Sequence, residues 1–251
     1  MKKPYLKKYG TIAGFTIWIV DGNYIRRTID EEFTNFDHHH YVHFIPKNEF
    51  WIDQGYGRGE EKYYIEHMLV EYWLIRDGRS HLEASKKAEL IERRERSKSI
   101  MLKKIIKKKM HRKEIIRKIH KTLLKKYSKI LNVWIVNGDL VRDLFFINFT
   151  EGGHDKVYPF IPENEIWIDD EVIPKERKFI LLHEIHERNL MLQGWSYDLP
   201  KKRFHSKKSL KSAHFSASEL EYFCRHHPHQ TDKKIKEEFE KLSSLLVVSP
   251  K

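Results

Sequence analysis

The chain has 251 residues, with 40% hydrophobic and 13% aromatic composition and a formal net charge of +12. This composition predicts one large folded domain or two small ones and excludes a disordered tail. Its single cysteine excludes an internal disulfide framework and favours a reducing, cytoplasmic compartment. The basic N-terminus runs directly into an apolar segment, so we expect no signal peptide, and no apolar run approaches the ~18 residues of a membrane span.

The first ninety residues contain signals for strands followed by helices. Two apolar runs flank Asp21-Gly22, a pair that suits a type I′ hairpin because both central residues need positive φ. FIPKNEFWID at 44–53 ends in another expected strand. Residues 61–77 follow helical spacing and end at a glycine, and a second helix should carry His81. These elements predict an α+β unit with a small antiparallel sheet and two helices.

The chain repeats itself at an offset of 116 residues. Residues 16–78 match 132–194 without a gap at 22 of 63 positions, and HFIPKNEFWID recurs as PFIPENEIWID. We therefore predict a tandem duplication of the α+β unit, joined by a long basic helix. The predicted parts are an N-terminal repeat (1–92), a basic helical linker (93–131), a C-terminal repeat (132–228) and a C-terminal helix and tail (229–251).

The linker carries the positive charge of the chain. Residues 93–129 hold seventeen Lys and Arg against two Glu, a net charge of +15, which leaves about −3 for the rest. Apolar residues at helical intervals predict a long basic amphipathic helix, either continuous or broken near His111.

So dense a positive charge predicts binding to nucleic acid or a nucleoprotein. An anionic membrane surface, a solvated helix between the repeats and pairing with another chain are the alternatives. No base-reading motif or aromatic platform is visible, so we expect contacts to the phosphate backbone. The residues expected to make them are Lys103, Lys104, Lys107, Lys108, Lys109, Arg112 and Lys113.

HEIHE at 183–187 supplies candidate metal ligands. His183 and Glu187 are four residues apart and therefore share one helix face. After a longer connection in the second copy, HLEAS at 81–85 realigns with HFSAS at 214–218, which pairs His81 with His214. Three histidines and a carboxylate suit Zn²⁺, with Fe²⁺ and Mn²⁺ as alternatives. The predicted ligands are His183, Glu187, His214 and His154, with His67, Glu71, His81 and His38 as a second candidate site. The alternative is a surface His–Glu pair beside unrelated histidines.

Glu184 is the candidate catalytic residue. It follows a predicted ligand directly and would act as general base on water, whereas its counterpart Met68 cannot accept a proton. A solvated helix residue is the alternative for Glu184. We expect Asp169 to orient a ligand histidine and Glu221, seven residues after His214, to complete the shell, although its aligned partner is alanine.

HEIHE resembles the HExxH motif of zinc-dependent hydrolases, in which two histidines bind zinc and the glutamate is the base. It departs from that motif by placing Glu at the fourth position and His at the third. The resemblance covers five residues and implies nothing about fold. The pattern HxxxE…AH, preceded by FIPxNEIWID, is also similar to uncharacterised microbial and phage proteins.

Two functions follow from these patterns. The first is a metal-dependent hydrolase of peptides or phosphodiesters with a degenerate N-terminal copy. The second is a non-enzymatic nucleic-acid or nucleoprotein-binding module with structural metal sites. The sequence leaves the oligomeric state open.

Overall fold

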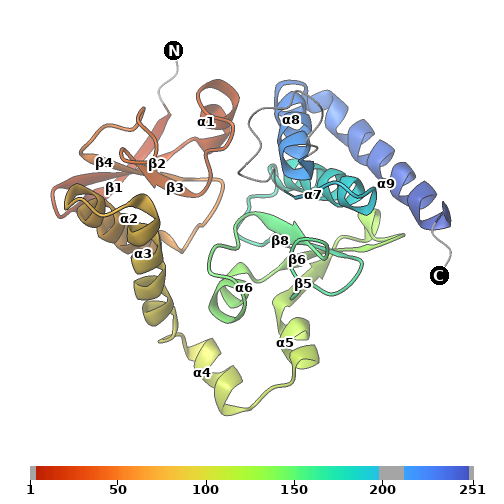
Figure 1. Ribbon diagram of the computed structural model, residues 1–251, viewed down its shortest axis with the longest axis horizontal. Helices are drawn as coiled ribbons and strands as arrows, with labels where there is room; N and C mark the ends of the chain where they lie inside the picture. The colour runs from red at the N-terminus through yellow and green to blue at the C-terminus, as the bar shows by residue number, and fades with distance from the viewer. Residues whose placement is uncertain (1–3, 198–211, 249–251) are drawn as a thin grey trace. The chain divides into compact units, whose positions relative to one another are not determined.

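A computed structural model of the chain describes residues 4–197 and 212–248 (Figure 1). It divides into two compact units. Unit 1 comprises Met1–Ile119 and Asn137–Thr150, and unit 2 comprises His120–Val136 and Glu151–Lys251. Each unit combines helices with one four-stranded sheet, so the predicted α+β class is confirmed. The units do not follow the repeat boundary, because Asn137–Thr150 lies in the second repeat but groups with unit 1.

Unit 1 contains one mixed sheet and six helices within the described residues. Its strands are β1 (Tyr5–Ile12), β2 (Phe15–Val20), β3 (Phe36–His38) and β4 (Glu49–Asp53), in the order β1-β2-β4-β3. Its helices are α1 (Gly22–Thr28), α2 (Glu61–Arg76), α3 (His81–Arg96), α4 (Ile100–Lys107), α5 (Arg112–Ile119) and α6 (Gly138–Leu144).

The predicted antiparallel sheet is wrong in one respect, because β2 pairs with β4 in parallel. The expected hairpin at Asp21-Gly22 is also absent. Asp21 instead caps α1, accepting a hydrogen bond from the Tyr24 N–H at 3.0 Å. Aspartate followed by glycine is favoured at helix starts as well as in tight turns, so the pair alone does not distinguish them. Gly22 is required here, because a Cβ at this position would lie 1.8 Å from the Asp53 carboxylate.

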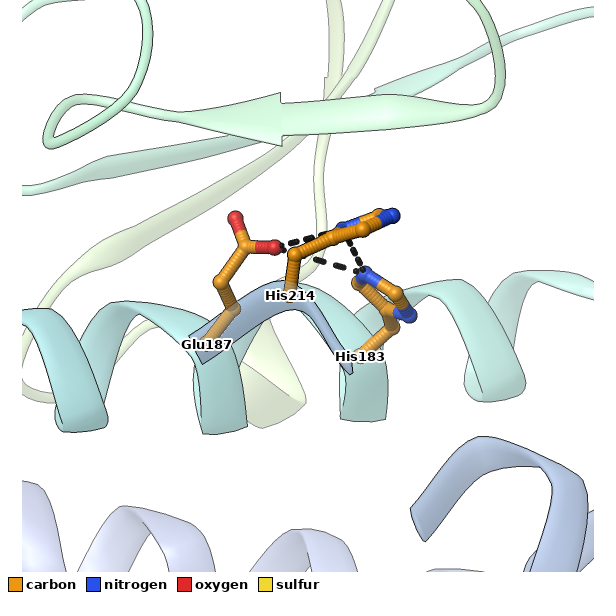
Figure 2. A group of neighbouring side chains, drawn as sticks. All are labelled: His183, Glu187 and His214. Carbon is orange, nitrogen blue, oxygen red and sulfur yellow. Dashed lines mark hydrogen bonds and ion pairs between the residues drawn. The ribbon is translucent and has the colours of Figure 1, made fainter. Parts of the chain in front are cut away.

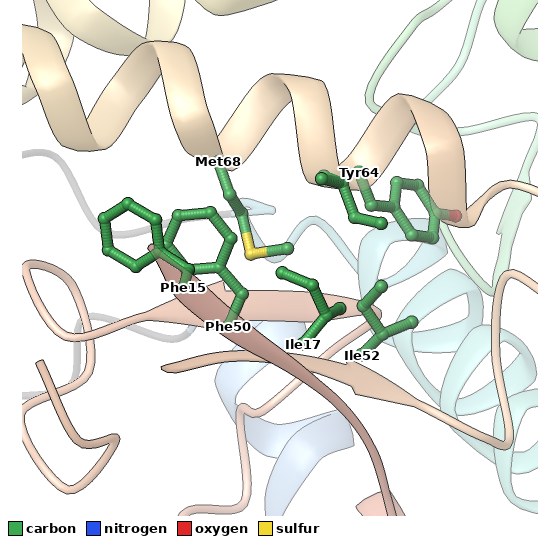
Figure 3. Packing of buried hydrophobic residues seen from close by; sticks show 7 residues of the cluster. Phe15, Ile17, Phe50, Ile52, Tyr64 and Met68 are labelled. Carbon is green, nitrogen blue, oxygen red and sulfur yellow. The ribbon is translucent and has the colours of Figure 1, made fainter. Parts of the chain in front are cut away.

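The sheet of unit 1 carries a hydrophobic layer on each face. On one face, α2 packs its Tyr64 and Met68 against the strands (Figure 3). Met68 is fully buried and lies beside Phe15 and Phe50. On the other face, Ile25 of α1 packs with residues of the strands and loops. The position equivalent to Glu184 is therefore an ordinary core position in the first copy.

The linker is not one long helix. α3 ends at Arg96, α4 and α5 follow as separate eight-residue helices, and Lys109 between them has φ +49°. The interruption falls near His111, the alternative that the sequence left open. Each short helix buries two apolar residues in unit 1 and exposes its basic face. The buried residues are Leu102, Ile105, Ile116 and Ile119.

Unit 2 has a sheet with the same arrangement of strands and has helices of its own. Its strands are β5 (His120–Leu123), β6 (Asn132–Val136), β7 (Gly152–His154) and β8 (Glu165–Asp169), in the order β5-β6-β8-β7. Its helices are α7 (Arg177–Leu192), α8 (Ala213–His226) and α9 (Thr231–Val248), with 3-10 turns at Lys125–Tyr127 and Pro228–Gln230. β6 and β8 are parallel, and α7 packs against α8 and α9. None of the helices described is long and apolar enough to span a bilayer.

Candidate metal centre

Three side chains from α7 and α8 converge in unit 2 (Figure 2). His183 and Glu187 project from one face of α7, one turn apart, and His214 reaches them from the first turn of α8. Glu187 Oε2 lies 2.9 Å from His214 Nδ1 and 3.5 Å from His183 Nε2. The two imidazole nitrogens are 3.2 Å apart. This arrangement can hold a metal ion.

The spacing of these atoms matches tetrahedral coordination. Zn²⁺ binds nitrogen and oxygen at roughly 2.0–2.2 Å, so two ligands at a tetrahedral angle lie about 3.3 Å apart. The three separations of 2.9, 3.2 and 3.5 Å bracket that value. The His214 side chain remains 35% exposed. Solvent therefore reaches this group of side chains at His214.

Glu221 of α8 fixes the first ligand. Its carboxylate accepts a hydrogen bond from His183 Nδ1 at 2.9 Å, so that Nε2 of the same ring faces Glu187 and His214. Glu221 is held in turn by Arg225 Nε at 2.8 Å, and Arg225 also contacts the buried Glu176 at 2.5 Å. The predicted outer role of Glu221 therefore has a definite geometry. Carboxylate partners of this kind commonly set the tautomer and basicity of ligand histidines.

His154 contacts the other oxygen of Glu187. Its Nδ1 accepts the Lys156 N–H at 3.1 Å, so the neutral ring carries its proton at Nε2. That Nε2–H donates to Glu187 Oε1 at 2.9 Å. His154 also forms, with Glu184 and Glu187, a second group of buried side chains that could hold a metal ion. The predicted ligand His154 therefore lies beside the other predicted ligands, where its contact also positions Glu187.

Glu184 lies beside this group, buried and without a hydrogen-bond partner among the residues described. Burial raises its pKa well above the usual range, and the neighbouring Glu187 raises it further. By contrast, hydrogen bonds from His154, His183 and His214 outweigh the effect of burial and lower the pKa of Glu187. The two carboxylates of HEIHE thus differ, because the three imidazoles favour the ionised form of Glu187 whereas burial favours the protonated form of Glu184.

Two glycines of β7 make room for Glu184 and Tyr158. A Cβ on Gly152 would lie 2.8 Å from the Trp167 carbonyl and 3.3 Å from Glu184 Oε1, and one on Gly153 would lie 2.6 Å from the Tyr158 ring. The first copy has phenylalanine and aspartate at these positions, and valine in place of Tyr158. Burial raises the pKa of Tyr158, with Glu184 and Glu187 adding to the effect, so its hydroxyl stays protonated. The sequence comparison contained these differences, but only the structure places them together.

The first copy retains the contacts that surround the histidine and glutamate pair of the site. His67 Nε2 lies 3.4 Å from Glu71, its Nδ1 lies 2.8 Å from Glu92, and Arg96 Nε donates to Glu92 at 2.8 Å. Burial lowers the pKa of His67, but hydrogen bonds with Glu71 and Glu92 outweigh it and raise the pKa to about 9. A protonated His67 therefore supplies the positive charge between the two carboxylates.

These contacts correct the alignment of the last helix. Glu221 and Arg225 lie 129 positions after Glu92 and Arg96 and make the same contacts, so Glu221 matches Glu92 rather than alanine. At that offset His214 matches Ser85, and its pairing with His81 is wrong. His81 lies at the start of α3, where its ring contacts Tyr41 with centroids 4.7 Å apart. The connection of different length after Gly194, partly outside the described residues, hid the true register.

The remaining predicted site residues lie elsewhere. Asp169 is buried, and its Oδ1 accepts the Glu171 N–H at 3.0 Å, closing the turn after β8. The predicted nucleic-acid-binding residues lie exposed on α4, α5 and the turn between them. Sequence reasoning missed Arg225 and Glu176, although Glu60 and Glu176 are identical at the offset of 116. Comparison of the chain with protein-family models, curated proteins and solved structures finds no match.

Proposed function

We propose that the chain is a metal-dependent hydrolase whose active site lies in unit 2. One observation carries the proposal: three ligand atoms with tetrahedral spacing lie next to a buried carboxylate that has no hydrogen-bond partner among the described residues. The ligands are His183, Glu187 and His214. We propose zinc as the ion, with Fe²⁺ and Mn²⁺ as alternatives, since two imidazoles and one carboxylate suit all three.

The residues around the ion have different roles. Glu221 and His154 orient His183 and Glu187, so the ligand atoms stay aligned before the ion arrives. A bound divalent ion acidifies water and polarises a carbonyl or phosphoryl oxygen. Glu184, which lies beside the ligands, would accept the proton from water once the positive charge of the bound ion favours its ionised form. The substrate class is a peptide or a phosphodiester.

The test is the metal content of the purified, untagged chain, followed by turnover of chromogenic peptide and phosphodiester substrates. We expect about one equivalent of metal and hydrolysis that a chelator abolishes. His183→Ala should lose the metal, because it removes a ligand, whereas the matched change His67→Ala in the first copy should retain it. A folded protein that binds no metal would refute the proposal.

A second candidate, binding of nucleic acid, rests on the linker. Its six predicted lysines form no ion pair within the described parts of the chain, although acidic residues pair with lysines elsewhere. Unpaired lysines on two short helices are available to phosphates. The residues are Lys103, Lys104, Lys107, Lys108, Lys109 and Lys113.

For this candidate we expect the logarithm of the association constant for duplex DNA to fall linearly with the logarithm of salt concentration. Replacing Lys103, Lys107 and Lys109 with alanine should reduce the slope by about 0.9 for each phosphate that the protein no longer neutralises. The matched control is Lys233→Ala with Lys236→Ala on α9, which should leave the slope unchanged. Affinity that does not depend on salt, or an equal effect of both variants, would exclude a phosphate-binding role for the linker.

A further inference from the structure

The first copy differs from the metal centre of unit 2 at one ligand position. It retains a ligand pair, His67 and Glu71, with Nε2 and Oε1 3.4 Å apart. It retains the outer frame as well: Glu92 holds His67, and His38 Nε2 lies 3.6 Å from Glu71 Oε2. His38 even accepts a backbone N–H at Nδ1, from His40 at 3.3 Å, as His154 does from Lys156. The third ligand is what this copy lacks.

The missing ligand corresponds to Ser85. The helices α3 and α8 match at the offset of 129, at which the fully buried Ala84 and Ala88 correspond to the fully buried Ala213 and Ala217. These alanines set the same helix face against the neighbouring helix in each copy. Residue 85 therefore occupies the helix position from which His214 reaches Glu187.

A tyrosine occupies the space between Ser85 and Glu71. The Tyr41 hydroxyl donates to Glu71 Oε1 at 3.0 Å, lies 3.3 Å from the His81 carbonyl oxygen and is close to the Ser85 side chain. Ser85 and Tyr41 together thus fill the space between the helix and Glu71. In unit 2 the imidazole of His214 alone fills the equivalent space beside Glu187. Glu71 is held there by a neutral hydroxyl, where Glu187 faces the second imidazole.

We propose that the first copy is a metal site lacking a single ligand, at Ser85, and that the Tyr41 hydroxyl holds Glu71 where the ion would bind. Ser85→His with Tyr41→Phe then completes a site of two imidazoles and one carboxylate for zinc or cobalt. This inference rests on the proposed function, because the centre of unit 2 serves as its template.

The experiment counts zinc equivalents in the full chain after dialysis. Ser85→His with Tyr41→Phe is expected to bind one equivalent more than the wild type, and adding His67→Ala should remove that extra equivalent. Ser85→Ala with Tyr41→Phe is the matched control and should gain none. Cobalt substitution gives a second readout, because the visible absorption of tetrahedral Co²⁺ should double in the variant.

The outcomes separate this inference from the proposed function. If the wild type binds one equivalent and the folded variant also binds one, the inference is overturned and the proposed function stands. If the wild type binds none and the variant binds one, the inference stands and the proposed function fails. Should the double variant not fold, Ser85→His alone, titrated with excess zinc, decides: no second equivalent overturns the inference.

Discussion

Glu184→Gln is expected to lower kcat by about 10²–10⁴-fold, the usual contribution of a general base. The amide has nearly the same shape as the carboxylate but cannot accept a proton from water. Since Glu184 makes no hydrogen bond with any described residue, the change should leave the fold and the metal content intact. The measurement is kcat on the substrate found by screening, with metal content determined on the same sample.

The matched control is Met68→Leu at the equivalent position of the first copy. Exchange of these side chains in a core is well tolerated, and Met68 is fully buried in the hydrophobic cluster of unit 1. We expect it to leave kcat unchanged. If Glu184→Gln retains full activity, Glu184 is not the base; if it loses the metal, Glu184 is a ligand instead.

Arg225→Ala is expected to lower the free energy of unfolding of unit 2 by about 3–5 kcal/mol, the cost of removing one partner from a buried ion pair. The Arg225 side chain is 2% exposed and pairs with both Glu176 and Glu221, so its removal takes the guanidinium from two carboxylates at once. Urea unfolding followed by tryptophan fluorescence measures the effect. Arg225→Lys should recover only part of the loss, because one ammonium cannot reproduce the fork of the guanidinium.

The same variant should also weaken metal binding by about 10–100-fold, as changes to the outer partners of metal ligands commonly do. Without Arg225, Glu221 no longer stays aligned with His183 Nδ1. Arg96→Ala in the first copy is the matched control. It should cost similar stability in unit 1, since Arg96 joins the buried Glu60 and Glu92, yet leave metal affinity unchanged. Equal effects of the two variants on metal affinity would contradict the assignment of the centre to unit 2.

Local patterns predicted some of the helices and the duplication, but not α1 or the division of the linker into separate helices. Helical spacing and a terminal glycine placed α2 and α7, and the repeat placed β4 and β8 at matching positions. The parallel pairing of β2 with β4 was not predictable from such patterns, because it joins segments that are distant in sequence and the connecting residues also suit a hairpin. Pairing of this kind is decided by tertiary packing rather than by local preference.

The pair His183 and Glu187 was predictable because His67 and Glu71 recur at the same spacing on one helix face. The role of His154 was not, since it depends on which ring nitrogen accepts the backbone N–H of Lys156. The match between His214 and Ser85 was not predictable either, because the connection before α8 differs in length from the one before α3. Contacts of Arg225 and Arg96 resolved that register where residue identity could not.

The assignment of α6 to unit 1 has a consequence for synthesis of the chain. α6 follows β6 of unit 2, yet its Arg142 lies within unit 1, where Nε contacts the buried Glu60 at 3.1 Å. The chain must therefore be synthesised as far as Thr150 before every segment of unit 1 exists. By then β5 and β6 of unit 2 have already been synthesised. The two units are thus interleaved along the chain, and cutting the gene at the repeat boundary would leave the first product without one of its helices.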